Sequence, residues 1–428
     1  MKKNPVIRPV EKAAFTIYSL LWRLSLPALS RNQRLAVGFE NRLLKGPLKE
    51  NAHIWIQAAS AGEAYLAWEL IKNLSRQHRL SVVLTTNTLQ GKEILDKAVK
   101  DINSRNARVD AQVTYFPFDM PSVMEKAVCS IRPRVMVLLE TEIWPGLLLA
   151  LKRNNCPAVI VNGRITEKSL SRYRIWPALW RSIRPDRILA ISNQDAGRFA
   201  DLFGRRGVAT MLNMKFDRVQ KKDISHGSPD TFGSVVSHGM DFAVLGSVRQ
   251  EEEADIENIL CELKRHRPNA VVGLFPRHMH RVPHWRRALD RLGLPWEHRS
   301  AMKKPAQAGT VVLWDVFGEL NKAYQCASAA FVGGSLAPLG GQNFLEPLIV
   351  GLKPVIGPHW ENFLWVGNQI VDQGLVHQSN SWQDVAEFLV AGMTHPEEKD
   401  TIRKEATAYI RKRQGGTRMA CELIKKYL

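Results

Sequence analysis

Cysteine is scarce in this sequence, and the few cysteines present do not suggest a pattern. The 428-residue chain holds five, spread widely and odd in number: Cys129, Cys156, Cys261, Cys326 and Cys421. Such spacing argues against a disulfide framework and against a cysteine-based zinc site. The cysteine usage therefore indicates a reducing compartment.

Acidic residues are in deficit. The chain carries 60 Lys and Arg against 41 Asp and Glu, a formal net charge of +19. A charge of this size bears on partners and association rather than on fold. No zinc-finger spacing, RNP-type aromatic motif or basic leucine zipper accompanies it, so nucleic acid is not an expected partner. An anionic membrane surface or a phosphorylated substrate fits the same charge better.

No apolar run near the N-terminus is long enough to cross a membrane. Residues 1–12 are basic, and the apolar stretch that follows is interrupted by Arg23 and Pro27, whereas a spanning helix needs about 20 residues. Arg23 also argues against a signal peptide. Four large side chains recur near one face of a helix: Phe15, Tyr18, Trp22 and Leu26. Residues 13–30 could therefore lie in a bilayer interface or form an ordinary helix packed on the domain, and both interpretations stay open.

Several familiar catalytic motifs are missing as well. The chain has no Walker loop, no G-x-S-x-G elbow and no G-x-G-x-x-G after a strand. It also has no D-x-D pattern, and Glu140 and Glu142 have no histidine beside them. The H-x-H pair His278 and His280 is weak evidence for a metal. We therefore expect neither a metal nor a resident cofactor.

What the sequence does have is a regular alternation of short apolar runs and longer amphipathic segments. The runs in the first half are HIWIQAA, LSVVLTT, RVMVLLE, PAVIVNG and RILAIS, and those in the second half are FAVLGS, AVVGLFP, VVLWD, AAFVGG and KPVIG. Strands of this length that alternate with helices are typical of βαβ units and parallel sheets. The fold class predicted is α/β, with two Rossmann-like doubly wound domains facing a cleft.

The expected domain organisation has five parts. They are a basic and apolar membrane-proximal segment at 1–50, a first Rossmann-like domain at 51–220, a linker at 221–240, a second Rossmann-like domain at 241–395 and a helical segment at 396–428. Ligands of such sheets bind beyond the carboxyl ends of the strands. The loops that follow the strands are therefore the candidate site.

Three of these loops carry chemistry. Gly333 to Pro347 is rich in glycine, whose backbone N–H groups can face a phosphate, and its Glu346 can accept hydrogen bonds from ribose hydroxyls. Glu63 follows a tight turn and stands where a helix would begin, so it could act as a general base or could only stabilise the helix start. Arg277 offers a charge for phosphate. A plain glycine-rich turn with a surface Glu346 is the alternative for the first loop.

Taken together, these motifs resemble the 3-deoxy-D-manno-octulosonic acid (Kdo) transferases of lipopolysaccharide assembly. The similarity extends from IWIQAASAGE through LLETEIWPGLL, VNGRITEKSLSRY, NMKFD and LFPRH to FVGGSLAPLGGQNFLEP and IGPHWENF. The resemblance implies an inverting, metal-independent glycosyltransferase of the GT-B fold. Such an enzyme would move Kdo from CMP-Kdo to a lipid A precursor, lipid IVA, at the cytoplasmic face of the inner membrane.

The resemblance also assigns residues. Glu63 matches the catalytic base, and Glu140 and Lys215 match the residues that stabilise the transition state. The CMP-Kdo-binding positions fall on Arg277, His278, Phe317, Gly318, Glu319, Asn343, Phe344, Leu345 and Glu346. The leaving CMP needs cations and amide donors for its developing charge, which fits Arg277, Lys215 and the glycine-rich turn.

The chain departs from the family pattern at several positions, among them Gln57, Gln90, Arg249, Gln342 and Phe344. A divergent member with an altered sugar or acceptor pocket would show such changes. Two other functions stay open: a GT-B enzyme with another nucleotide-sugar donor or acceptor, and a catalytically silent membrane-associated scaffold. The sequence does not indicate the number of Kdo units added or the oligomeric state.

Overall fold

The structure is a computed structural model that describes residues 9–75, 79–104, 109–219, 235–237 and 239–428. By its internal contacts the chain divides into two units, residues 1–218 with 413–428, and residues 219–412. Each unit is built around one seven-stranded parallel sheet, so the predicted α/β class with two doubly wound domains is confirmed. The predicted linker at 221–240 and the basic residues 1–8 lie largely outside the described residues.

The sheet of the first unit has the strand order β3-β2-β1-β4-β5-β6-β7. Its strands are β1 (Ile54–Gln57), β2 (Leu80–Thr86), β3 (Val109–Tyr115), β4 (Val135–Leu139), β5 (Ala158–Gly163), β6 (Arg187–Ala190) and β7 (Val208–Thr210). The central strands β1, β4 and β5 are buried along their whole length, because helices cover both faces of a parallel sheet. The strand order reverses between β1 and β4, which is where ligands of such sheets bind.

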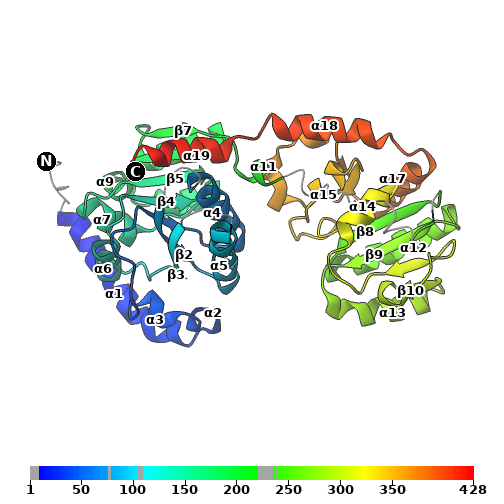
Figure 1. Ribbon diagram of the computed structural model, residues 1–428, viewed down its shortest axis with the longest axis horizontal. Coiled ribbons are helices and arrows are strands. Elements are labelled where there is room, and N and C mark those ends of the chain that lie inside the picture. Colours follow the sequence, from blue (N-terminus) through cyan, green and yellow to red (C-terminus); the bar gives the residue numbers. More distant parts are fainter. Residues whose placement is uncertain (1–8, 76–78, 105–108, 220–234, 238) are drawn as a thin grey trace. The chain divides into compact units, whose positions relative to one another are not determined.

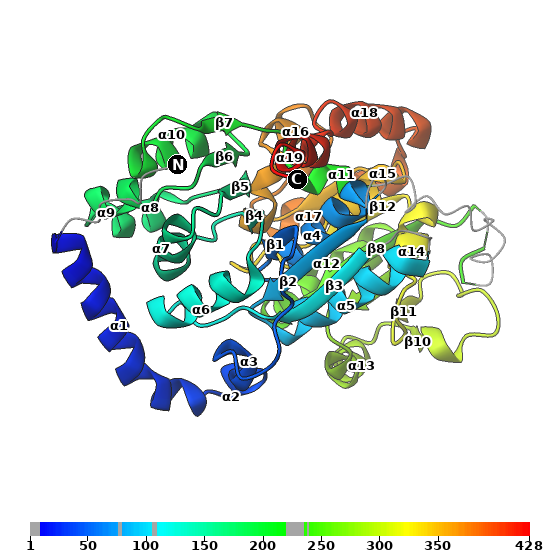
Figure 2. The ribbon, with the colours of Figure 1, turned by 60° about the vertical axis from the view of Figure 1, so that its left-hand side comes forward.

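Two layers of helices cover this sheet. The helices of the unit are α1 (Pro9–Ser30), α2 (Gln33–Ala36), α3 (Phe39–Arg42), α4 (Ala61–Leu74), α5 (Leu89–Ser104), α6 (Pro121–Ile131), α7 (Pro145–Arg153), α8 (Glu167–Tyr173), α9 (Pro177–Ser182), α10 (Asn193–Phe203), α11 (Lys215–Arg218) and α19 (Gly416–Lys425). Helices α4, α5 and α19 share one apolar core with the sheet, and α6, α7 and α10 share the other (Figures 1 and 2). The last helix of the chain thus completes the first unit, which the sequence pattern did not indicate.

Helix α1 packs its aromatic face on the first unit. Phe15 is buried, the Tyr18 hydroxyl donates a 2.9 Å hydrogen bond to Asp119 Oδ2, and the ring of Trp22 lies 5.5 Å from that of Phe118. The idea that this face enters a bilayer is therefore wrong, because it is already covered by protein. The opposite side of α1 exposes four large apolar side chains: Ile17, Leu20, Leu21 and Leu24. Among the described residues no helix is both long and apolar enough to span a membrane.

The sheet of the second unit has the order β10-β11-β9-β8-β12-β13-β14. Its strands are β8 (Phe242–Val248), β9 (Val271–Pro276), β10 (Trp296–His298), β11 (Val311–Leu313), β12 (Ala329–Val332), β13 (Pro354–Ile356) and β14 (His377–Gln378). Its α-helices are α12 (Glu253–His266), α13 (Val282–Arg291), α14 (Leu320–Cys326), α15 (Leu345–Ile349), α16 (Gln369–Asp372), α17 (Trp382–Thr394) and α18 (Lys399–Arg411), with short 3-10 turns at Gln250–Glu252, Met279–Arg281, Arg299–Ala301 and Glu361–Val366. The order reverses between β8 and β12.

Four strands were not predicted, and all four lie at sheet edges. They are β3 and β7 in the first unit and β10 and β14 in the second. Their side chains are mostly half-buried or exposed. An edge strand is covered less completely than a central one, so it lacks the continuous apolar run by which the other ten were found.

Candidate active site

The candidate catalytic carboxylates meet where the strand order of the first unit reverses. Glu63 lies in the first turn of α4, directly after β1, and Glu140 and Glu142 follow β4. Strands β1 and β4 are paired neighbours, with Gln57 opposite Leu138. The parallel topology therefore brings these three acids to one edge of one sheet, as the sequence predicted for Glu63 and at least one of the other two.

Glu63 is held by the start of its own helix. Ser60 caps α4, and its hydroxyl donates a 3.2 Å hydrogen bond to Glu63 Oε1, while the backbone N–H of Ala59 donates at 2.7 Å to Glu63 Oε2. Only 9% of the residue is exposed. Burial, followed by the nearby charge of Glu142, raises the pKa of the Glu63 carboxyl to about 8. A carboxylate with a pKa near neutrality can take a proton from a hydroxyl and hold it.

Glu142 is the second buried acid. Its Oε2 accepts hydrogen bonds from Trp144 Nε1 at 2.5 Å and from Gln57 Nε2 at 3.2 Å. Burial raises the pKa of this carboxyl above its usual value, and the two hydrogen bonds oppose the shift. Gln57 in turn accepts a 2.7 Å hydrogen bond from Thr85. The departure from the family at Gln57 thus places a neutral donor on Glu142.

Glu140 faces a cation. Its Oε1 lies 2.7 Å from Lys215 Nζ and accepts a longer hydrogen bond, 3.4 Å, from Asn162 Nδ2. The backbone of Glu140 is left-handed, with φ of 54°. This conformation costs a non-glycine residue about 1–2 kcal/mol, and such cost is concentrated at functional sites. The structure therefore brings together all three predicted catalytic residues, Glu63, Glu140 and Lys215, within one unit.

The K-F-D motif has a second task, which the sequence did not reveal. Asp217 accepts hydrogen bonds from the backbone N–H groups of Gly415 and Thr417, both at 2.6 Å, and so caps α19. Phe216, the middle residue of the motif, is buried. Lys215 therefore lies on a short helix, α11, that is tied to the last helix of the chain.

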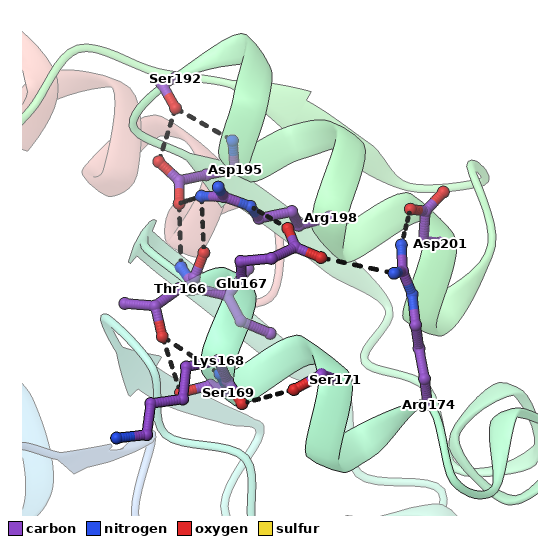
Figure 3. A network of polar contacts seen from close by, with 11 residues as sticks. Thr166, Glu167, Lys168, Ser169, Ser171, Arg174, Ser192, Asp195, Arg198 and Asp201 are labelled. Carbon is purple, nitrogen blue, oxygen red and sulfur yellow. Dashed lines mark hydrogen bonds and ion pairs between the residues drawn. The ribbon is translucent and has the colours of Figure 1, made fainter.

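A polar network fixes the next motif, N-G-R-I-T-E-K-S-L-S-R-Y. Asp195 of α10 accepts a 2.9 Å hydrogen bond from the backbone of Ile165, and Arg198 donates to Glu167 of α8 at 3.1 Å (Figure 3). The backbone carbonyl of Arg164, just before this network, accepts a hydrogen bond from the Thr141 hydroxyl. The network therefore also steadies the turn that carries Glu140 and Glu142.

In the second unit the glycine-rich turn is closed by a carboxylate. Glu252, only 1% exposed, accepts hydrogen bonds from the backbone N–H groups of Gly334 at 2.6 Å, Ser335 at 2.8 Å and Leu336 at 2.8 Å. It also accepts one from Arg249 N at 3.1 Å. The expectation that these amides face a phosphate is wrong for these three, because Glu252 already occupies them.

Within the predicted ligand-binding segment Asn343 to Glu346, the structure separates residues with polar side chains from residues with buried apolar ones. Asn343 Nδ2 donates a 2.9 Å hydrogen bond to Glu346 Oε1, just before and within α15. The side chains of Phe344 and Leu345 are buried. These two residues could therefore meet a ligand only through their backbone, whereas Asn343 and Glu346 present polar groups.

The other predicted donor residues lie on loops of the same unit. Glu319 accepts hydrogen bonds from Arg299 at 2.8 and 3.0 Å and from Trp314 Nε1 at 3.0 Å. Beside it, Gly318 has a left-handed backbone and the Phe317 ring is 78% exposed. An exposed aromatic ring next to a fixed carboxylate is suited to stack on a base.

Arg277 and His278 follow β9, and both are exposed. The ring of His278 lies 5.5 Å from that of His280. Desolvation and the charges of Arg249 and Arg277 lower the pKa of His278, so this corner of the unit is electropositive. Within the described part of the chain, no group of three or more His, Cys, Asp or Glu side chains is arranged to hold a metal ion.

The family profile described as 3-deoxy-D-manno-octulosonic-acid transferase matches residues 31–218, the segment that forms most of the first unit. A 3-deoxy-D-manno-octulosonic acid transferase of Bordetella pertussis is 27% identical over 396 residues, which cover 90% of this chain and 89% of the relative. The chain is a glycosyltransferase related to the Kdo transferases. A Kdo transferase of Haemophilus influenzae is 28% identical over 388 residues, covering 88% and 87% of the two chains.

Solved structures agree on the fold of this glycosyltransferase. A glycosyltransferase from Rickettsia africae matches with a TM-score of 0.55 at 11% identity, over 88% of this chain and 99% of the other. The Anabaena protein Alr3699/HepE, solved with UDP, matches with a TM-score of 0.52 at 14% identity, over 89% and 100%. The predicted GT-B fold is thereby confirmed.

Proposed function

We propose that this glycosyltransferase moves Kdo from CMP-Kdo to a lipid A precursor, with Glu63 as the general base. The observation that carries the proposal is that two neighbouring carboxylates have different surroundings. Burial raises the pKa of Glu63 to about 8, whereas Glu140 is paired with Lys215 at 2.7 Å. A buried acid with a raised pKa suits a proton acceptor, and a carboxylate held against a cation provides fixed charges for the transition state. The relationship to the Kdo transferases supplies the sugar.

The reaction is one displacement. The oxygen of an acceptor hydroxyl forms a bond to the anomeric carbon of Kdo, and the bond from that carbon to the phosphate oxygen of CMP breaks. CMP leaves with the bonding electron pair, and the hydroxyl proton passes to Glu63. Because the attack and the departure occur on opposite faces of the sugar ring, the configuration inverts. The step is balanced without a metal or cofactor, so we expect activity in the presence of a strong chelator.

Lys215 and Glu140, both in the first unit, would stabilise the charges that develop in the transition state. The sugar centre becomes oxocarbenium-like and the phosphate gains negative charge as the bond breaks. Lys215 and Glu140 supply one charge of each sign at a fixed 2.7 Å separation. Fixed charges of this kind need no reorganisation during the reaction.

The second unit would hold the nucleotide. Exposed Arg277 and His278 offer a cation and a hydrogen-bonding ring, and Phe317 offers a stacking surface. Asn343 and Glu346 present an amide and a carboxylate to the ribose and base. Competition between cytidine, uridine and adenosine nucleotides for the protein tests this assignment: preference for CMP supports it, and preference for a uridine nucleotide would indicate another nucleotide-sugar donor.

A peripheral position on the inner membrane completes the proposal. The outward side of α1 exposes Ile17 by 60%, Leu20 by 55%, Leu21 by 59% and Leu24 by 70%. Together with the net charge of +19, this side fits a helix that lies on an anionic bilayer where a lipid acceptor is found. A Leu20→Ser, Leu24→Ser double variant should bind anionic vesicles less than wild type, and unchanged binding would contradict the assignment.

A catalytically silent scaffold would show no transfer at all. The intact trio of Glu63, Glu140 and Lys215 favours an enzyme, because a scaffold has no need of a buried carboxyl whose pKa is raised into the range where it can exchange protons near neutral pH.

A further inference from the structure

The donor side of the second unit lacks the phosphate cradle that its glycine-rich turn suggests. The backbone N–H groups of Gly334, Ser335 and Leu336 all donate to the carboxylate of Glu252. A carboxylate placed there also repels an incoming anion. A negatively charged donor must therefore find its cation among nearby side chains.

Arg249 is a cation that lies against this turn. It follows β8 directly, and Gly333 and Gly334 follow β12 directly, so both stand at the point where the strand order reverses. A side-chain carbon added to Gly334 would meet Arg249 Cγ at 3.6 Å and Gln342 Nε2 at 3.1 Å. The side chains of Arg249 and Gln342 thus both lie against Gly334.

The guanidinium of Arg249 is only weakly engaged by protein. Its nearest carboxylate is that of Glu251, 3.8 Å from Nε, which is too long for a hydrogen bond. Nε itself is buried, and the described residues provide it with no hydrogen-bond partner. The side chain is 27% exposed. Buried polar groups in native proteins are normally satisfied, so this arginine has binding capacity left for a ligand.

The surroundings strengthen the attraction for an anion. Arg277 and His280 lie near enough to act with Arg249 on the titration of His278, and all three disfavour its charged form. The backbone of Arg249 is fixed because its N–H donates to Glu252 at 3.1 Å. The backbone of Arg249 is thus held in place, while its partly exposed side chain can bind a ligand.

We propose that Arg249, with Gln342 beside it, binds the anionic group of the donor and makes the protein selective for donors with that charge. The inference rests on the proposed function. Two groups of a sugar-acid nucleotide have the required chemistry, the phosphate and the sugar carboxylate, and a guanidinium binds either one through paired N–H groups.

The test compares cytidine with CMP, which differ only in the phosphate. Each ligand is titrated into full-length wild type, Arg249→Gln, Arg249→Met and a control, Arg286→Gln, whose residue is exposed on α13. Arg249→Met keeps an unbranched stem against Gly334 and guards against misfolding of the first variant. If the phosphate is the ligand, the preference of wild type for CMP over cytidine falls about tenfold in both Arg249 variants, a change of about 1.4 kcal/mol, and is kept in the control.

A second arm addresses the carboxylate. If the preference for CMP is unchanged but the KM for CMP-Kdo rises about tenfold in the Arg249 variants alone, Arg249 binds the sugar acid. If neither quantity changes, or if the Arg286→Gln control changes equally, the inference is overturned. Failure of wild type itself to bind CMP or to transfer Kdo would overturn the proposed function, which is a separate and recognisable result.

Discussion

The Nζ of Lys215 lies 2.7 Å from Oε1 of Glu140, and the two residues come from segments 75 positions apart in the chain. The pair joins the loop after β4 to the short helix α11. The two side chains thus form an ion pair in the resting protein, close to the buried Glu63.

Lys215→Gln should lower the rate of transfer about 10²–10³-fold, the usual effect of removing one preorganised donor to a developing charge. CMP affinity should change little, because the described contacts of Lys215 lie in the first unit. Steady-state kinetics measures this, with Lys126→Gln at an exposed position of α6 as the control. A rate within twofold of wild type would exclude Lys215 from the transition state.

Glu63 should make the protein less stable as pH rises. Its folded-state pKa, about 8, lies above the ordinary 4.5. Below 4.5 the carboxyl is protonated in both states and contributes no pH dependence. Between 4.5 and about 8 the unfolded state releases its proton while the folded state keeps it, so the free energy of unfolding falls. Glu63→Gln removes this penalty.

Glu63→Gln should therefore be more stable than wild type at pH 8, by about 1–3 kcal/mol, and the difference should shrink as pH falls toward 5. Denaturant unfolding at several pH values measures it. The same substitution at the exposed Glu93 on α5, Glu93→Gln, provides the comparison. A Glu63→Gln advantage that did not depend on pH would show that Glu63 has an ordinary pKa.

Asp217→Asn should loosen the C-terminal helix. One uncharged amide replaces a carboxylate that caps α19 through two 2.6 Å hydrogen bonds, and losing such a cap costs about 1–2 kcal/mol. The amides of α19 should exchange hydrogen faster, and transfer should slow because Lys215 shares α11. Unchanged exchange in α19 would mean that the cap contributes nothing.

Glu252→Ala should disorder the donor loop. The substitution leaves four backbone N–H groups without their buried acceptor, at a cost of about 2–4 kcal/mol. Glu252→Gln, which keeps one acceptor oxygen, should be intermediate. CMP binding should weaken in the same order. Stability equal to wild type in Glu252→Ala would show that the loop does not depend on this carboxylate.

Much of the fold could be predicted because central parallel strands are buried on both faces. Runs such as RVMVLLE can therefore be recognised in the sequence. Edge strands such as β7 cannot, since β7 has only three residues and they are half-buried or exposed. For α1 the sequence predicted the aromatic face of the helix, but it did not show that this face packs on the first unit. Periodicity gives the aromatic side, and only the fold shows that Phe118 and Asp119 lie against it.

The site was predictable where a residue follows a strand. Glu63, Glu140 and Glu142 lie at strand ends, so topology alone brings them together. Lys215 depended on the family motif, because nothing local points to its partner 75 residues earlier. Glu252 was missed because an acid in an acidic helix start is expected only to interact favourably with the helix dipole. Nothing in the neighbouring sequence indicates that its carboxylate accepts hydrogen bonds from a glycine-rich turn about 80 residues later.

The most direct test of the central claim is transfer of labelled Kdo from CMP-Kdo, generated in situ, to a tetraacylated lipid A precursor by wild type and by Glu63→Gln. We expect labelled lipid with wild type and a rate at least about 10²-fold lower with Glu63→Gln, the share ordinarily supplied by a general base, while both proteins bind CMP equally. Equal transfer by the two proteins would contradict the role of Glu63, and absence of transfer by wild type that still binds CMP would contradict Kdo or the lipid as substrate.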